Sequence, residues 1–134
     1  MSRENADVIR ECFARFSERD VDGFLALVHP DVSWLPANVV LEGRKEPHRG
    51  HAGIRNWFEE VTAKGRYLVT MSSAVADEND RLLIPAFVKV ESDEPSHEAQ
   101  STLVWYLFEL EDGRVRRLDT FLDEYRARAA LRAD

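Results

Sequence analysis

The chain has 134 residues, of which 44% are hydrophobic and 10% aromatic, and a formal net charge of −7 at pH 7. Domains of about 100–150 residues are the commonest, so this length predicts a single domain over residues 1–134 with its own hydrophobic core. The acidic balance argues against two kinds of partner, nucleic acid and an anionic membrane surface, because both require a basic patch.

The cysteine content bears on disulfides, zinc and compartment. A single cysteine, Cys12, excludes an intrachain disulfide and a cysteine-based zinc site. The N-terminal residues include no apolar signal segment. The longest apolar run, residues 82–88, is far shorter than the roughly 20 residues that a membrane-spanning helix needs. We therefore expect a cytoplasmic protein.

Three helices are predicted in the first half of the chain. The first, over residues 4–18, is indicated by apolar residues at three- and four-residue spacing: Val8, Ile9, Cys12, Phe13 and Phe16. A short second helix begins at Asp20 and stops before Pro30. A third begins at Gly50 and ends near residues 64–65. Between the second and third, Val32, Trp34 and residues 39–41 are predicted to be short extended segments.

From residue 66 onward the hydrophobic period changes to two, which is typical of strands. We expect strands over residues 66–76, 82–91, 98–110 and 114–122, with a terminal helix within residues 123–134. Helices followed by a run of strands indicate an α+β fold. A ten-residue strand spans about 33 Å and a fourteen-residue helix about 21 Å. We therefore predict a cone-shaped, curved antiparallel sheet that wraps around the N-terminal helices and encloses an interior pocket.

The third long strand is apolar on both faces, whereas a sheet with one wet face alternates apolar with polar residues. Val104, Tyr106 and Phe108 share one face, and Leu103, Trp105 and Leu107 share the other. We assign Trp105, Leu118 and Thr120 to the interior, and Asp119 and Phe121, with the Val104 face, to the outside. An apolar outer face predicts a homodimer through it. The alternative is a monomer in which the C-terminal segment covers that face.

Several stretches carry a resemblance to a known family: residues 27–34 (LVHPDVSW), 48–58 (HRGHAGIRNWF), 108–115 (FELEDGRV) and 121–123 (FLD). Across nearly its whole length the sequence resembles SnoaL-like proteins of the nuclear transport factor 2-like superfamily. The resemblance implies a cone-shaped α+β barrel with an interior cavity, usually dimeric. It assigns no activity, because this fold hosts ketosteroid isomerases, polyketide cyclases, dehydratases, epoxide hydrolases and non-catalytic binders.

The resemblance allows the acid–base positions of two enzyme groups to be tested. Ketosteroid isomerases of this superfamily use a carboxylate base, a tyrosine and a protonated aspartic acid. The matching positions here hold Pro36, Cys12 and Trp105 in the same order. Proline and tryptophan cannot accept a proton, and a thiol is a weak hydrogen-bond donor. The aspartate of SnoaL-type cyclases also falls on Trp105, so the sequence preserves neither set of acid–base positions.

Other residues are candidates for a ligand site. Trp34, Phe58 and Trp105 are predicted to form pocket walls, with Leu118 and Thr120 beside them; ordinary core packing is the alternative. Such walls suit an apolar or aromatic ligand.

His48 is the candidate acid–base residue, because an imidazole titrates near neutral pH; a surface or supporting role is the alternative. Its neighbours Glu46 and His51 have the residue types of a zinc site, but the two histidines do not share a helix face, so we predict no metal and no cofactor. Arg49 is predicted to line the ligand pocket, where it would bind a carboxylate; a structural ion pair is the alternative.

The sequence thus predicts a cytoplasmic homodimer that binds a small apolar or aromatic organic molecule and transforms it by acid–base chemistry of the isomerase, lyase, cyclase or hydrolase type. A non-catalytic metabolite-binding dimer and a protein-interaction module stay open as alternatives. A titratable group beside the bound ligand would favour the enzyme, and a purely apolar cavity would favour the binder.

Overall fold

We analysed a computed structural model, which describes residues 2–63, 66–91 and 101–133. The helices are α1 (Ser2–Ser17), α2 (Val21–Leu25), α3 (Ala37–Leu41), α4 (Gly50–Ala63) and α5 (Glu124–Arg132). The strands are β1 (Val28–Trp34), β2 (His48–Arg49), β3 (Arg66–Met71), β4 (Ala76–Glu78), β5 (Arg81–Glu91), β6 (Ser101–Glu111) and β7 (Arg114–Phe121). The predicted helix end at 64–65 and strand start at 98–100 lie outside the described residues.

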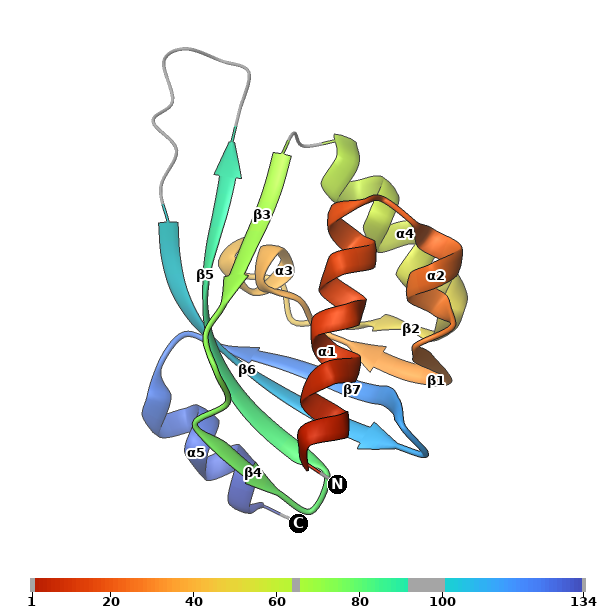
Figure 1. The fold of residues 1–134 in the computed structure, drawn as a ribbon. Coiled ribbons are helices and arrows are strands. Elements are labelled where there is room, and N and C mark those ends of the chain that lie inside the picture. The colour runs from red at the N-terminus through yellow and green to blue at the C-terminus, as the bar shows by residue number, and fades with distance from the viewer. Residues whose placement is uncertain (1, 64–65, 92–100, 134) are drawn as a thin grey trace.

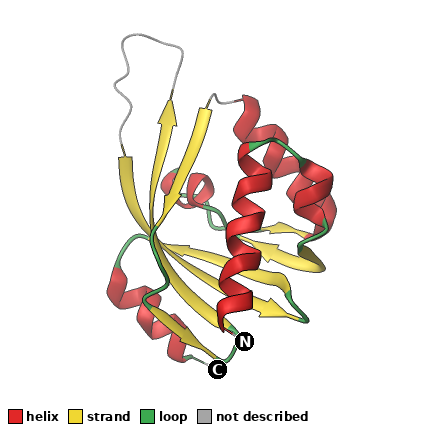
Figure 2. Ribbon diagram, viewed as in Figure 1, coloured by secondary structure: helices red, strands yellow, loops and turns green. Residues whose placement is uncertain are grey.

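The strands form one curved sheet in the order β2-β1-β7-β6-β5-β3 (Figure 1). The short strand β4 pairs with the first residues of β5, whereas β3 pairs with its later part. Every pairing is antiparallel except that of β1 with β7, which is parallel. The N-terminal helices pack into the concave side, and α5 packs on the opposite side (Figure 2). The predicted α+β fold with a curved sheet around the N-terminal helices is confirmed.

Local signals place the helices that build the concave side. Asp20 caps α2, because its Oδ1 accepts a hydrogen bond of 3.0 Å from the backbone N–H of Gly23. Gly53 lets α4 pass close to β2: a Cβ added there would lie 3.0 Å from the carbonyl carbon of His48. This close approach fixes where the His48 side chain lies relative to α4.

The segment between β1 and β2 differs from its prediction. Residues 39–41 were expected to be extended, but they belong to the helix α3. Ala37, Asn38 and Val39 are buried there, so tertiary packing outweighs the β-propensity of the two valines. The second helix also ends earlier than expected, and Pro30 lies within β1, at a register irregularity where a strand tolerates proline.

The concave side holds a dense aromatic core. Its rings are Phe13, Phe16, Phe24, Trp34, Trp57, Phe58, Tyr67, Tyr106 and Phe108, each no more than 7% exposed. The rings of Phe16 and Trp57 stack with centroids 4.6 Å apart, and those of Trp34 and Trp57 are 5.2 Å apart. These side chains fill the interior of the cone, so the predicted interior pocket stays a prediction.

The prediction for the faces of β6 is wrong. Phe108 pairs with Leu118 and Tyr106 pairs with Thr120, which places Val104, Tyr106 and Phe108 inside with the correctly predicted interior face of β7. Trp105 instead lies on the outer side, opposite Phe121. Because both faces of β6 are apolar, the alternation alone could not set its register against β7, and the pairing also shifts at Glu109 and Leu110.

The outer face of the sheet is covered only in part. Ala127 and Leu131 of α5 pack on Leu83 and Leu107, as the monomer alternative expected of the C-terminal segment. Farther along the same face Phe87 is 49% exposed and Leu103 is 42% exposed. No helix in residues 2–63, 66–91 and 101–133 is long and apolar enough to cross a membrane.

Candidate functional site

His48 lies on β2, at the edge of the sheet, and faces inward. It pairs with Trp34 across β2 and β1, so both side chains share the concave face. Its side chain is 16% exposed, and its Nε2 lies 3.3 Å from Oε2 of Glu60 on α4. The candidate acid–base residue therefore has a carboxylate partner that the sequence analysis did not identify.

Asn38 and Arg44 extend this pair into a network. The amide Nδ2 of Asn38 donates to Oε1 of Glu60 at 3.3 Å, and Nε1 of Trp57 donates to Oδ1 of Asn38 at 2.9 Å. Arg44 forms an ion pair with the same Glu60 oxygen. We use the name "mouth cluster" for Trp34, Asn38, His48, Glu60 and Tyr67, which come from β1, α3, β2, α4 and β3.

Burial and nearby charge set the protonation of His48. Desolvation by burial lowers the pKa of the His48 imidazole below its ordinary value, and the Arg44 guanidinium lowers it further. The Glu60 carboxylate opposes this shift but does not cancel it. His48 is therefore neutral at pH 7, which is the form that accepts a proton.

This shift predicts how stability depends on pH. Unfolded His48 titrates near 6.5 and folded His48 below that value, so between the two the unfolded state binds more protons. The free energy of unfolding should therefore rise with pH across this interval. Urea unfolding at a series of pH values should show a smaller rise in His48→Gln than in the wild type. His29→Gln is the matched control, because it removes a histidine that lies beside Glu111 on the outer side. Equal slopes of the free energy of unfolding against pH in the wild type and in His48→Gln would contradict the prediction.

The mouth cluster contains one buried polar atom with no partner. Nε1 of Trp34 is inaccessible and makes no hydrogen bond. Nε2 of His48 and the hydroxyl of Tyr67 are also inaccessible, but the first lies beside Glu60 and the second beside the Tyr106 hydroxyl. The Tyr67 hydroxyl faces that of Tyr106, and burial raises the pKa of both phenols, so both stay protonated. The cluster thus offers one unpartnered donor, the Trp34 indole, beside one neutral base.

The structure brings some of the predicted site residues together and separates others. Trp34, Phe58 and Leu118 all belong to the interior core, as predicted. Thr120 is also interior, but its hydroxyl already donates to the backbone oxygen of Leu35 at 2.8 Å. Trp105 packs on the outer side beside the cluster of α5, so the prediction that it forms an interior wall is wrong.

The prediction that Arg49 lines the interior pocket is also wrong. Arg49 pairs with Ser33, and Ser33 alternates with the buried Val32 and Trp34, so Arg49 points to the outer side of the sheet and is exposed. Its neighbour His48 takes the inward position in the same two-residue strand, and only the pairing with β1 decides which of the two faces inward.

Sequence reasoning missed Glu60, Asn38 and Tyr67. Glu60 follows Trp57 by three residues on α4, so helical periodicity places it beside the buried stripe and could have identified it. Asn38 carried no such signal, because no helix was predicted between Pro36 and Gly50. Tyr67 reads as an ordinary strand residue, and its partner contacts depend on tertiary packing.

The positions matched to the isomerases and cyclases hold no acid or base in the folded chain. Cys12 is 1% exposed, and burial raises the pKa of its thiol to about 12, so it stays protonated. Pro36 precedes α3 as its N-terminal flanking residue. Among the described residues no group of three or more His, Cys, Asp and Glu side chains could hold a metal ion.

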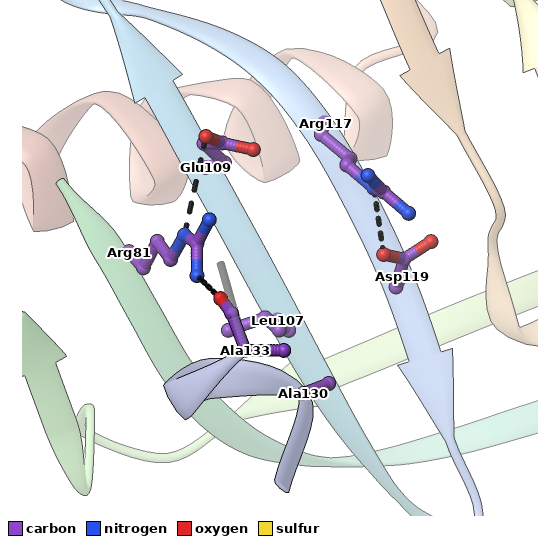
Figure 3. A pocket seen from close by; sticks show the side chains of 7 residues that line it. All are labelled: Arg81, Leu107, Glu109, Arg117, Asp119, Ala130 and Ala133. Atoms are coloured by element: carbon purple, nitrogen blue, oxygen red, sulfur yellow. Dashed lines mark hydrogen bonds and ion pairs between the residues drawn. The ribbon is translucent and has the colours of Figure 1, made fainter. Parts of the chain in front are cut away.

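A hollow of about 180 Å³ lies between α1 and the sheet, beside Ile9, Met71 and Ile84, and two others lie on the outer side of the sheet. One, of about 200 Å³, lies between α5 and the sheet, with Leu107 and Ala130 beside the pairs Arg81–Glu109 and Arg117–Asp119 (Figure 3). The other, of about 710 Å³, is a polar groove that shares Glu109 and Arg117 with the first and extends to Arg49. Neither hollow includes a residue of the mouth cluster.

The sequence of the chain matches a known protein family. The model of the SnoaL-like domain matches residues 9–118, which is most of the chain. The chain belongs to the SnoaL-like domain family. The matched part runs from α1 into β7 and includes every residue of the mouth cluster, whereas α5 lies beyond it. The family resemblance predicted from sequence is confirmed.

Solved structures share the fold of this SnoaL-like chain. TerC, co-crystallized with polyporic acid, has a TM-score of 0.74 and 22% identity over 97% of this chain and 99% of TerC. An NTF2-like protein from Burkholderia pseudomallei has a TM-score of 0.73 and 19% identity over 97% of this chain and 98% of its own. A candidate polyketide cyclase from Sinorhizobium meliloti has a TM-score of 0.68 and 22% identity, over 90% and 98%. A search of curated proteins finds no match. The TM-scores show that these chains share a common fold.

Proposed function

We propose that this SnoaL-like chain binds a small, largely apolar or aromatic organic molecule inside the cone and that His48 transfers a proton on it. The observation that supports this proposal is the buried indole N–H of Trp34, which makes no hydrogen bond and lies in the same cluster as the His48–Glu60 pair. A buried polar group without a partner costs about 1–3 kcal/mol, so such groups call for a partner. A bound molecule is the partner we propose.

The residues of the mouth cluster define what such a ligand carries. The indole N–H of Trp34 can only donate. A ligand with an acceptor oxygen, such as a carbonyl or ether group, would satisfy it. The surrounding aromatic rings, among them Trp57 and Phe58, would contact the rest of the molecule.

Room for the ligand is proposed to come from α3. This helix of five residues contacts α4 through Asn38 and also contacts β7. Its contacts with α4 rest on the side-chain hydrogen bonds of Asn38 to Trp57 and Glu60. We propose that an outward movement of α3, which would break these bonds and uncover the buried Ala37 and Val39, opens the interior.

The proposed chemistry uses a neutral base with a carboxylate behind it. His48, kept neutral by burial, would accept a proton from the ligand at Nδ1, because its Nε2 faces the Glu60 carboxylate 3.3 Å away, and that carboxylate would stabilise the imidazolium that forms. The same imidazolium would return the proton at another atom. Such a transfer fits isomerase, lyase, cyclase and hydrolase reactions, and it needs no metal or cofactor.

Similar structures lend support. TerC was co-crystallized with polyporic acid, so a protein of this fold has been crystallized with an organic compound. The similar protein from Sinorhizobium meliloti is named as a candidate polyketide cyclase.

Native mass spectrometry of the purified chain tests the proposal. We expect a fraction of molecules to carry an added small-molecule mass that denaturation releases. Trp34→Phe keeps an aromatic side chain but removes the buried donor, so it should lower the bound fraction. Phe87→Tyr, altered on the outer face, is the control. The absence of any added mass, together with no change in melting temperature on titration with aromatic ketones, would overturn the proposal.

A non-catalytic binder is the second candidate. It is favoured by the absence of an acid or base at the positions of Cys12, Pro36 and Trp105. Incubation of the recovered molecule with the chain separates the two candidates: an enzyme converts it, and a binder returns it unchanged. An interaction module would instead leave the interior without a ligand.

We also propose that the chain forms a homodimer through the exposed apolar part of the outer sheet face. Phe87 pairs with Leu103 across β5 and β6, and Pro85 pairs with Trp105 beside them. Large apolar side chains gathered on one face are typical of an interface. The sequence analysis placed Val104, Tyr106 and Phe108 on the outer face of β6, whereas the structure places Leu103 and Trp105 there. The proposed interface therefore consists of other residues than those predicted.

Light scattering coupled to size-exclusion chromatography checks this proposal. We expect about twice the chain mass of 15.4 kDa for the wild type. Leu103→Asp should reduce the mass to that of one chain, because it would bury a carboxylate in the interface. Val75→Asp, at an exposed residue outside these pairs, should leave the mass unchanged. A wild type of single-chain mass at all concentrations would contradict the prediction.

A further inference from the structure

The polar groove on the outer side of the sheet is separate from the proposed interior site. Its volume is about 710 Å³, and its charged lining consists of three arginines, Arg49, Arg116 and Arg117, and four acidic residues, Asp31, Asp80, Glu109 and Glu111. Ser33, Arg49 and Arg117 lie on β1, β2 and β7, on the face opposite the mouth cluster. A function of this groove is therefore independent of the interior.

Strand pairing lines up three of these side chains. Ser33 pairs with Arg49 on β2 and with Arg117 on β7. Neighbouring strands are about 4.8 Å apart, and paired residues point to the same face. The short hydroxyl side chain of Ser33 therefore lies between two long side chains that end in guanidinium groups.

The guanidinium groups in the groove retain free hydrogen-bond donors. In the described part of the chain, Arg49 makes no ion pair or side-chain hydrogen bond, and it is exposed. Arg117 uses its Nε, which lies 2.8 Å from Oδ2 of Asp119 (Figure 3). A guanidinium has five N–H donors. Arg49 is thus wholly available, and Arg117 still has the donors of its two terminal nitrogens.

We propose that the row Arg49–Ser33–Arg117 binds the carboxylate group of a small organic molecule. The planar fork of Arg49 matches the two oxygens of a carboxylate, and such charge-assisted pairs are about twice as strong as neutral hydrogen bonds. The Ser33 hydroxyl and Arg117 supply further donors from the adjacent strands. Because Ser33 is small, the anion can lie between the arginines instead of above them.

Acidic residues at the edges of the groove restrict the ligand. Asp31 lies two residues before Ser33 on the same side of β1, and Glu109 is paired with Arg117 on the neighbouring strand. Glu109 also lies 3.9 Å from Arg81. These carboxylates would repel a second negative charge and favour an amino group there. The groove therefore fits a single carboxylate on a neutral or amino-bearing molecule and disfavours polyanions.

Acetate and acetamide, which have nearly the same shape and differ in charge, provide matched probes. Each is titrated into the isotopically labelled chain at constant ionic strength, and NMR follows the backbone amides and the arginine Nε–H groups. We expect saturable shifts at Ser33, Arg49 and Arg117 with acetate and none with acetamide. Shifts spread over many arginines without saturation would overturn the proposal, because they would report a general salt effect.

Variants locate the site. Arg49→Gln should weaken acetate binding at least about tenfold, the loss expected for one charge-assisted contact. Arg55→Gln, at an exposed arginine of α4 paired with Asp22, should bind acetate like the wild type. Trp34→Phe should also bind acetate normally, since the interior is not involved. Wild-type affinity in Arg49→Gln, with an otherwise unchanged amide spectrum, would overturn the assignment.

Discussion

Replacement of Trp57 with alanine is expected to lower the free energy of unfolding by about 3–5 kcal/mol, the usual cost of removing a buried tryptophan. Trp57 is 1% exposed and lies at the centre of the aromatic core. Its ring stacks on Phe16 at 4.6 Å and lies 5.2 Å from the ring of Trp34. A domain has a total stability of about 5–15 kcal/mol, so this one change removes a large part of it.

The polar atom of Trp57 adds to this loss. Its Nε1 donates to Oδ1 of Asn38, and Asn38 in turn donates to Glu60. Alanine at 57 would leave the Asn38 oxygen without this donor in a buried position, which carries its own cost. Trp57→Phe keeps most of the ring packing and loses only the donor, so it should cost less than Trp57→Ala.

Urea unfolding followed by circular dichroism measures these differences. Tyr125→Ala is the matched control, since it also removes an aromatic ring but from a side chain that is 84% exposed; we expect a change within about 0.5 kcal/mol. A loss for Trp57→Ala no larger than that of Tyr125→Ala would show that the rings of the concave side are not packed as described.

His48→Gln is expected to lower the turnover of the molecule recovered from the interior by about 10²–10⁴-fold, the usual contribution of a general acid–base group. This prediction rests on the proposed enzyme function. Glutamine is polar and of similar size, so the fold should persist, but it cannot exchange a proton near neutral pH. The circular dichroism spectrum and the mass of bound ligand separate a lost reaction from lost binding.

Glu60→Gln tests the positioning role of the carboxylate. Glu60 raises the pKa of His48, so its loss should move the acidic limb of the pH–rate profile to lower pH while reducing the maximum rate. His29→Gln, which removes a histidine from the outer side, should leave both unchanged. A Glu60→Gln profile with an unmoved acidic limb would show that His48 is not the group that titrates.

The fold was predictable where the sequence carries a periodic pattern. The three- and four-residue spacing around Ile9 and Phe16 predicts α1, and the alternation after residue 66 predicts the sheet. The alternation in β7 also predicted that Leu118 and Thr120 face inward. In β6 both faces are apolar, so alternation carried no information about direction, and Trp105 was assigned to the wrong side.

The candidate site was predictable only in part. His48 was identified from the chemistry of its side chain, which does not depend on the fold. Its partner Glu60 lies 12 residues away in the chain, on α4, and Asn38, which donates to Glu60, lies 10 residues away, on α3. Arg49 was misplaced because inward and outward positions in the two-residue strand β2 depend entirely on how β1 pairs with it.

The sequence by itself determined the family, the α+β class, the order of the long elements and His48 as the titratable candidate. These properties follow from local patterns and side-chain chemistry, which one strand or helix expresses alone. The tertiary structure decided which face of β6 is interior, that residues 37–41 form a helix, and that Glu60 meets His48 while Arg49 lies outside. Each of these depends on register and packing between segments distant in the chain, and no local pattern encodes that relationship.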